Sequence, residues 1–205
     1  MKLAAVMISC PERADVRNRT VQSLSSTDWR EVPDVVIDDG VEKGRISRID
    51  ATWRRGLARA ATADADVVVL MEDDLEFNLH VRENIVLWSR LRGANSHQPF
   101  FGSLYNPGHP AVHTRPDDCY RVMAPEGCWG AQALVVSPAL AAYFLHHWHE
   151  EAGEPDLRMP RLASRFVPIY YHMPSLVEHV GQVSTWGGRA HSAIDFDRAW
   201  RAPAP

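Results

Sequence analysis

Apolar residues in the first half of the chain follow two patterns that alternate along the sequence. Short apolar runs predict buried strands at residues 3–9, 33–40 and 66–74. Stretches with apolar residues at helical spacing predict helices at residues 15–26, 46–63 and 79–91. Such alternation of strands and helices predicts an α/β fold whose central sheet is mostly parallel and flanked by helices.

The second half of the chain has a different pattern. Residues 100–125 are rich in Pro, Gly, Asn and Asp, which predicts loops and short strands. The apolar run AQALVVS predicts another strand, and Pro138 after it suits the first turn of a helix over residues 139–149. The remaining expected elements are a short helix within 151–165, a late strand at FVPIYYHMP and a disordered tail at 198–205.

Polar clusters follow the three strands predicted in the first half. They are residues 9–13, the pair Asp38-Asp39, and the acidic run 72–74. Ligands of parallel sheets bind beyond the carboxyl ends of the strands. We therefore expect the three clusters to meet at one edge of the sheet and to form a binding site there.

The acidic run raises a question of charge. In VVVLMEDDLEFN, Glu72, Asp73 and Asp74 stand together at the end of an apolar strand, where each carboxylate repels its neighbours and loses hydration. A cation would relieve the repulsion, and carboxylate oxygens suit Mg²⁺ or Mn²⁺, which complete their coordination with phosphates and water. The alternative is that the acids cap the following helix or only solvate the strand end.

Composition narrows the class of protein. The 205 residues are 45% hydrophobic and 23% charged, with a net charge of −4, which is typical of one globular domain and argues against a primary nucleic-acid binder. Three scattered cysteines without a CxxC motif indicate a reducing, cytoplasmic setting rather than a disulfide framework or a zinc site. No apolar run is long enough to cross a membrane, and we expect the N-terminal run to be a strand rather than a signal peptide.

Several motifs together resemble the GT-A-fold glycosyltransferases, which use nucleotide-sugar donors. A strand ending in EDD resembles their metal-binding acidic motif, and CPERADVRNRTVQSL resembles the segment after their first strand. The segment GCWGAQALVVSPALAAYF resembles the part that shapes the acceptor side. MPSLVEHVGQVSTWG is similar to the late strand and loop whose histidine completes the metal shell, with a P-S-L-x-x-H-x-G pattern found in N-acetylglucosaminyltransferase-like branches.

This resemblance implies a GT-A (Rossmann-like) fold and an organisation of the chain. Residues 1–197 would form a single domain, with a nucleotide-binding half at 1–92 and a smaller acceptor-side half at 93–197. The chain is short for the family, so the loops on the acceptor side must be abbreviated.

Residue by residue, the resemblance also implies a metal and donor site. Asp74 matches the acid that binds the metal directly, and His179 matches the late metal ligand. Asp73 matches the acid near the donor ribose, and Glu72 the one near the donor sugar hydroxyls. Gly181 would let the backbone approach the diphosphate closely.

Further positions match contacts to the base and ribose, namely Pro11, Arg13 and Asp39. Arg45 and Arg189 could help to stabilise the charge of the leaving diphosphate. A solvated surface arginine is the simpler interpretation of either one alone.

Inverting transfer also needs a general base. Asp156 stands between the acceptor-side segment and His179, at a predicted helix start whose dipole would keep it ionised. Serving as the N-cap of that helix is an equally good interpretation of this residue. Trp129 and Trp186 could stack on sugar on the acceptor side, or belong to the core.

The sequence therefore predicts a glycosyltransferase that depends on Mn²⁺ or Mg²⁺. It would move a sugar from a nucleotide diphosphate, by default a UDP-sugar, through inverting direct displacement. The acceptor stays open among a saccharide, a peptide, a metabolite and a modified nucleobase, as do the donor sugar and the oligomeric state. Alternatives are a catalytically silent nucleotide- or sugar-binding module and a Mg²⁺-dependent phosphotransferase or phosphatase of doubly wound type.

Overall fold

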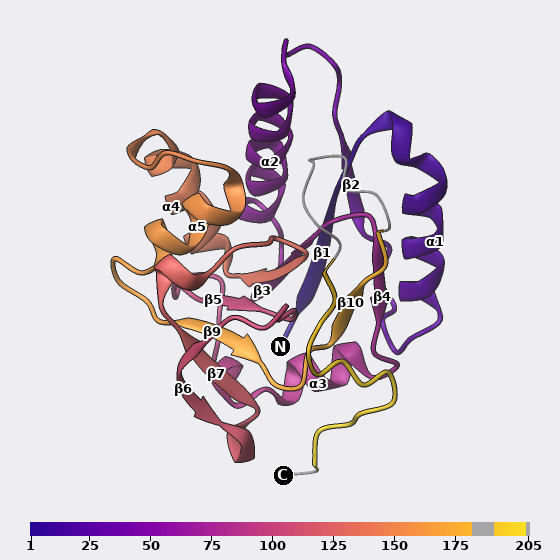
Figure 1. Cartoon of the computed structure of the whole chain (residues 1–205), viewed down its shortest axis with the longest axis vertical. Coiled ribbons are helices and arrows are strands. Elements are labelled where there is room, and N and C mark those ends of the chain that lie inside the picture. Colours follow the sequence, from indigo (N-terminus) through magenta and orange to yellow (C-terminus); the bar gives the residue numbers. More distant parts are fainter. Residues whose placement is uncertain (182–190, 204–205) are drawn as a thin grey trace.

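The fold is built around a large sheet (Figure 1). A computed structural model describes residues 1–181 and 191–203, and within them the main sheet has eight strands. Their spatial order is β2 (Asp34–Ile37), β1 (Leu3–Ser9), β3 (Val67–Met71), β8 (Ala133–Val136), β5 (Phe101–Ser103), β9 (Ile169–His172), β7 (Tyr120–Met123) and β6 (Ala111–Arg115). A second sheet pairs β4 (Leu75–Phe77) with β10 (Val177–His179).

Helices account for most of the remaining regular structure in the described ranges. The α-helices are α1 (Ala14–Ser25), α2 (Arg45–Ala61), α3 (Val81–Leu87), α4 (Pro138–His147) and α5 (Pro155–Ala163). Short 3₁₀ turns are η1 (Pro11–Arg13), η2 (Ser89–Leu91), η3 (Pro116–Asp118), η4 (Pro125–Gly127) and η5 (Trp148–Glu150). None of the helices in the part of the chain that the structure describes combines the length and apolar character needed to cross a membrane.

The main sheet is mixed, so the expectation of a mostly parallel sheet holds only for β2, β1 and β3 and for the separate pair of β5 and β9. β1 pairs in parallel with both β2 and β3, and α1 and α2 form the crossovers that parallel pairing requires. β8 runs antiparallel to β3 and β5, and β7 runs antiparallel to β6 and β9. Only the short turn η3 joins β6 to β7, and so short a connection can only produce an antiparallel pair.

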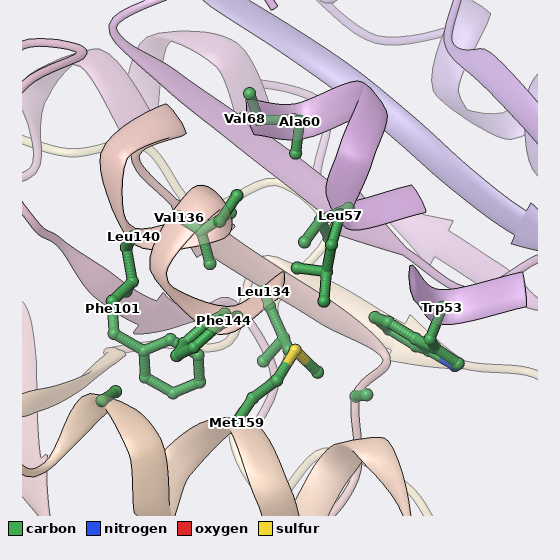
Figure 2. Close-up of a cluster of buried hydrophobic side chains, with 14 of the residues drawn as sticks. Trp53, Leu57, Ala60, Val68, Phe101, Leu134, Val136, Leu140, Phe144 and Met159 are labelled. Carbon is green, nitrogen blue, oxygen red and sulfur yellow. The ribbon is translucent and has the colours of Figure 1, made fainter. Parts of the chain in front are cut away.

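Helices α2, α4 and α5 cover one face of the sheet (Figure 2). Apolar side chains of α2 recur at helical spacing and are buried against β1 and β3. Gly56 lets α2 approach closely, because a Cβ atom there would lie 2.3 Å from Cδ1 of Ile8. Side chains from the three helices and the sheet converge in Figure 2: Trp53, Leu57, Ala60, Val68, Phe101, Leu134, Val136, Leu140, Phe144 and Met159.

The opposite face is covered by α1, α3 and the β4–β10 sheet. Alternate residues of β1 serve the two faces, since Val6 and Ile8 pack under α2 while Met7 packs on this second side. In Figure 1, β4 and β10 lie side by side next to α1. This small sheet matters for the site because it brings β10, the last strand in the described residues, next to the end of β3.

Most predicted elements of the first half are confirmed within a few residues, but two features differ. The strand β4 follows the acids directly, where we expected a turn leading to a helix. The expected disordered tail is wrong for residues 198–203. The backbone of Arg198 and Trp200 accepts hydrogen bonds from Leu79 N and from Asn78, and Ala202 N donates to Asn84. Buried amide side chains that need partners thus hold the segment against α3.

Candidate functional site

A pocket of about 300 Å³ lies at the carboxyl ends of the three parallel strands. Ser9 at the end of β1, Asp38 after β2 and the acids 72–74 after β3 all line it. The expectation that three strand-end clusters meet at one edge is therefore confirmed. The rest of the lining includes Trp129, Gly130 and Gln132 before β8, Glu154 and Asp156 at the start of α5, and His179 with His191.

Asp74 and His179 form the centre of the acidic wall. They are 105 positions apart, and the pairing of His179 with Leu75 in the small sheet places His179 Nε2 3.1 Å from Asp74 Oδ2. The second oxygen, Asp74 Oδ1, is buried and has no hydrogen-bond partner in the described part of the chain. A buried carboxylate oxygen without a partner is costly unless a ligand completes it.

The other ring nitrogen of His179 fixes the orientation of the imidazole. Nδ1 lies 3.2 Å from the backbone oxygen of His191, which can only accept, so Nδ1 donates. Metal-binding histidines usually carry this kind of second hydrogen bond, and here it leaves Nε2 on the side of Asp74. Burial lowers the pKa of His179, but the hydrogen bond and charge of Asp74 outweigh it and the pKa is raised.

Arg13 is the cation that contacts the acids in the described structure. Its Nε donates to Asp73 Oδ1 at 2.7 Å, and its Nη2 donates to Asp74 Oδ2 at 2.5 Å. Asp73 Oδ2 also accepts from Ser9 Oγ at 2.6 Å. Burial still raises the pKa of Asp73 against these partners, whereas His179 and Arg13 overcome burial and lower the pKa of Asp74.

Glu72 stands apart from this ion-pair network. Its backbone N–H donates to Gln132 O at 2.9 Å, and its carboxyl accepts from Gln132 Nε2 at 3.3 Å. Burial, reinforced by the charge of Asp74, raises the pKa of Glu72 to about 8. The side chain is therefore mostly protonated at neutral pH and can donate a hydrogen bond into the pocket.

Gly181 lies directly against the Asp74–His179 pair. A Cβ atom at this position would be 2.3 Å from Asp74 Oδ2 and 2.8 Å from His179 Nε2. Only glycine lets the backbone pass here without moving one of the two side chains. The close approach expected of Gly181 is thus toward the acid and the histidine.

Asp156 occupies the other wall of the pocket, in the first turn of α5. Its Oδ2 accepts from Gly130 N at 2.9 Å, while Oδ1 is buried and lacks a hydrogen-bond partner within the described residues. Gly130 has φ +85°, a left-handed conformation that favours glycine, and a Cβ there would meet Gln132 Oε1 at 2.4 Å. The N-cap alternative does not apply, because the N-cap of α5 is Glu154.

Several predicted site residues lie elsewhere. Pro11 and Asp39 are exposed and do not line the pocket, and Asp39 pairs with Arg55 at 2.7 Å. Arg45 begins α2 and is exposed outside the pocket lining. Trp186 and Arg189 lie outside the described residues.

Trp129, predicted on the acceptor side, lines the pocket as a partly exposed ring. It is 42% exposed, lines the pocket and packs edge-on against both His109 and His191. A partly exposed aromatic ring in the wall of a pocket is suited to stacking on an apolar sugar face.

Several pocket residues were not assigned a role from the sequence. Of the pair Asp38-Asp39, it is Asp38 that lines the pocket, and it accepts a hydrogen bond from Nε of Arg48, a residue in the first turn of α2. Gln132 and His191 also line the pocket. A polar residue just before the apolar run of β8 could have pointed to Gln132, but nothing near His191 in the sequence marks it.

The donor atoms present fit a divalent ion only in part. Among residues 1–181 and 191–203, no group of three or more His, Cys, Asp or Glu side chains is arranged to hold a metal. Asp74 and His179 supply two ligands, and the unpartnered Asp74 Oδ1 can supply another oxygen. Mg²⁺ and Mn²⁺ accept such incomplete sites when substrate phosphates and water fill the remaining positions.

Comparisons with known proteins add no information about this pocket. No protein-family profile matches this chain, and no curated protein matches it either. The resemblance to GT-A enzymes accordingly stays a hypothesis, and a function has to be inferred from the pocket.

Proposed function

We propose that this protein is a metal-dependent glycosyltransferase of GT-A type that uses a nucleotide diphosphate sugar, with UDP as the default nucleotide. The observation that carries the proposal is one pocket with two unlike carboxylate walls. Asp74 lies beside His179 on one wall, and Asp156 with its unpartnered oxygen lies on the other. Two such walls match the needs of a reaction with an anionic leaving group and an acceptor that must lose a proton.

The architecture supports the same proposal. A parallel β2–β1–β3 unit places its strand ends under the pocket, and the antiparallel β8 brings Gln132 and Trp129 to the far side. Ile8, Ile49 and Trp53 give the end of the pocket near Asp38 an apolar lining that suits a flat base. The donor would then extend from that end toward the acids.

Asp74 and His179 would hold the divalent ion through a carboxylate oxygen and Nε2. The bound ion supplies positive charge that stabilises the departing nucleotide diphosphate. Arg13 adds a cation beside the same acids, and the protonated Glu72 can donate to a sugar hydroxyl.

Asp156 would act as the general base. Gly130 N–H donates to Oδ2 of this residue, which fixes the carboxyl group at the start of α5 and would leave Oδ1 facing the acceptor. Its Oδ1 would take the proton from the acceptor hydroxyl as that oxygen forms a bond to the anomeric carbon. The bond from this carbon to the diphosphate oxygen breaks on the opposite side, so configuration is inverted.

The alternatives are less well supported by the pocket. A phosphatase of doubly wound type needs a nucleophilic aspartate at the end of the first strand, where this chain has Ser9 and Cys10. A silent binding module has no need for an acid with a free acceptor oxygen at Asp156. Only a transfer measurement separates such a module from an enzyme.

The test is a melting-temperature panel of nucleoside diphosphates followed by a transfer assay. One nucleoside diphosphate should raise the melting temperature with Mn²⁺ and not with EDTA, by an amount equivalent to about 2.7 kcal/mol at 100 times its Kd. The matching UDP-sugar, or its counterpart with another base, should then release nucleotide in the presence of acceptor candidates. Binding without any turnover would favour the silent module, and no metal-dependent shift would remove the proposal.

A further inference from the structure

Arg13 neutralises the acid pair from inside the protein. Its side chain is 15% exposed, those of Asp73 and Asp74 are 5% and 6% exposed, and that of His179 is 8% exposed. Charges this well shielded from water must be compensated by their neighbours. The guanidinium reaches both carboxylates at once, with Nε on Asp73 and Nη2 on Asp74.

We propose that Arg13 is the built-in counter-cation of the acid pair and makes divalent-metal binding conditional on the nucleotide diphosphate. The inference rests on the function proposed above and adds that metal binding depends on the diphosphate. The protein would take up little metal by itself, and metal and diphosphate would enter together. Arg13 would then exchange its contact with Asp74 for one with a phosphate oxygen.

The first support is that Arg13 and the proposed metal share an atom. Asp74 Oδ2 accepts from Arg13 Nη2 and also lies 3.1 Å from His179 Nε2. An ion held between Asp74 and His179 would therefore lie close to the guanidinium. The repulsion between them is weakly screened, because the site is largely closed to water.

The second support is the local charge balance. Asp73 and Asp74 contribute two negative charges, and Arg13, in contact with both, returns one positive charge. A divalent ion alone would leave these three side chains with excess positive charge. A diphosphate brings the missing negative charge, and guanidinium groups pair well with phosphate oxygens.

The third support is position. Arg13 lines the pocket together with the acids, so its side chain borders the space where the diphosphate would lie. Arg17 follows four residues later, in α1, and its Nη1 donates to Ser9 Oγ at 2.9 Å and to Cys10 O at 3.3 Å. Arg17 therefore offers a matched control: the same charge, close by, with different partners.

The experiment measures Mn²⁺ binding with and without UDP, by titration calorimetry and by the EPR signal of free Mn²⁺. The wild-type protein should bind Mn²⁺ at least tenfold more tightly with saturating UDP than alone. Arg13→Met should bind Mn²⁺ alone at least tenfold more tightly than wild type, and UDP should add much less to it. Arg17→Met should stay within about threefold of wild type in both conditions.

A second variant and a second measurement distinguish a change in Mn²⁺ affinity from misfolding of the variant. Arg13→Gln removes the same charge and should give the same result as Arg13→Met. Mn²⁺ alone should raise the melting temperature of both variants more than that of wild type, because it replaces the missing cation. Circular dichroism would verify that both variants fold.

The outcomes separate the two proposals. If wild type binds Mn²⁺ with UDP but folded Arg13 variants bind Mn²⁺ alone no better than wild type, Arg13 does not control the site and only this inference fails. This inference also fails, by itself, if Arg17→Met has as large an effect as Arg13→Met. If wild type binds no Mn²⁺ even with UDP, the proposed function fails and the inference fails with it.

Discussion

The two walls of the pocket are both acidic but are satisfied in different ways. On the wall formed after β3, Asp73 and Asp74 are tied to Arg13, Ser9 and His179. On the opposite wall, Asp156 has one backbone hydrogen bond and one buried oxygen without a partner in the described structure. The carboxylates of the first wall are paired with positively charged and hydrogen-bonding side chains. The carboxylate of the second wall has an oxygen that can still accept a hydrogen bond.

This difference suggests that one wall binds a cation and the other accepts a proton. A carboxylate that is already paired is a poor proton acceptor and a good ligand for a cation. A carboxylate with a spare lone pair, held by Gly130 N–H at the start of α5, can accept a proton without first breaking an ion pair. Substitutions on the two walls should therefore differ in their effects on metal-dependent nucleotide binding and on transfer.

The largest effect should follow from Asp74→Ala. Removing this carboxylate takes away the proposed ligand next to His179 and one of the two acids that Arg13 contacts. Metal-dependent UDP binding should be lost, and with it all transfer, while the fold remains. Titration calorimetry with Mn²⁺ and UDP measures this loss, and Asp117→Ala in the exposed turn η3 is the control. Unchanged metal-dependent affinity would contradict the role of this wall.

Asp156→Asn should fail in a different way. The amide cannot take a proton, so transfer should fall by about two to four orders of magnitude, the usual range for a general base. Binding of UDP with Mn²⁺ should stay within about threefold of wild type, because Asp156 belongs to the other wall. Asp118→Asn, the same change at an exposed position outside the pocket lining, is the control. Near-normal turnover in Asp156→Asn would make Glu154 or Glu151 the next candidate, or indicate a retaining enzyme.

His172 is a buried histidine outside the pocket lining, and its pKa is shifted in the opposite direction to that of His179. His172 is 1% exposed and packs edge-on against Trp88 and Trp200. Its Nδ1 donates to Pro174 O at 2.6 Å, and Nε2 is buried without a partner in the described structure. Burial lowers the pKa of His172 to about 4, whereas Asp74 raises that of His179.

This depressed pKa predicts acid sensitivity of the fold. Between pH 6.5 and 4 the unfolded state binds the proton first, so stability is fully present above about pH 6.5 and falls as the pH drops toward 4. The loss from His172 should be at most about 3 kcal/mol in the free energy of unfolding. Urea unfolding of wild type and His172→Asn at several pH values measures it, with His97→Asn as the exposed control. Equal pH slopes for wild type and His172→Asn would show that His172 is not responsible.

The smallest expected effect is that of Gly181→Ala. The added methyl group would push against Asp74 Oδ2 and His179 Nε2, so one of the two must move. We expect Mn²⁺ affinity in the presence of UDP to fall by about tenfold, equivalent to about 1.4 kcal/mol. Gly127→Ala is a suitable control, since a Cβ there meets nothing within 4 Å. An affinity equal to wild type would mean that the close approach of Gly181 is not needed.

The sequence by itself determined the local elements and the chemistry at the strand ends. The apolar runs of β1 and β3 and the helical spacing in α2 depend on short-range periodicity, which can be read without knowing the partners. The acids 72–74 and Asp156 were recognisable for a similar reason. The acids 72–74 follow an apolar run and Asp156 follows a proline at a helix start, and these local signals mark them as candidate site residues.

Tertiary structure decided which of these groups meet and which face the pocket. Asp38 faces it while Asp39 pairs with Arg55 outside, because neighbouring residues beyond a strand point to different sides. The direction of the later strands and the pairing of β4 with β10 depend on register between distant segments, and that pairing sets His179 beside Asp74. The contact of Arg13 with both acids likewise depends on where η1 and the start of α1 lie relative to β3. No local sequence pattern encodes that position.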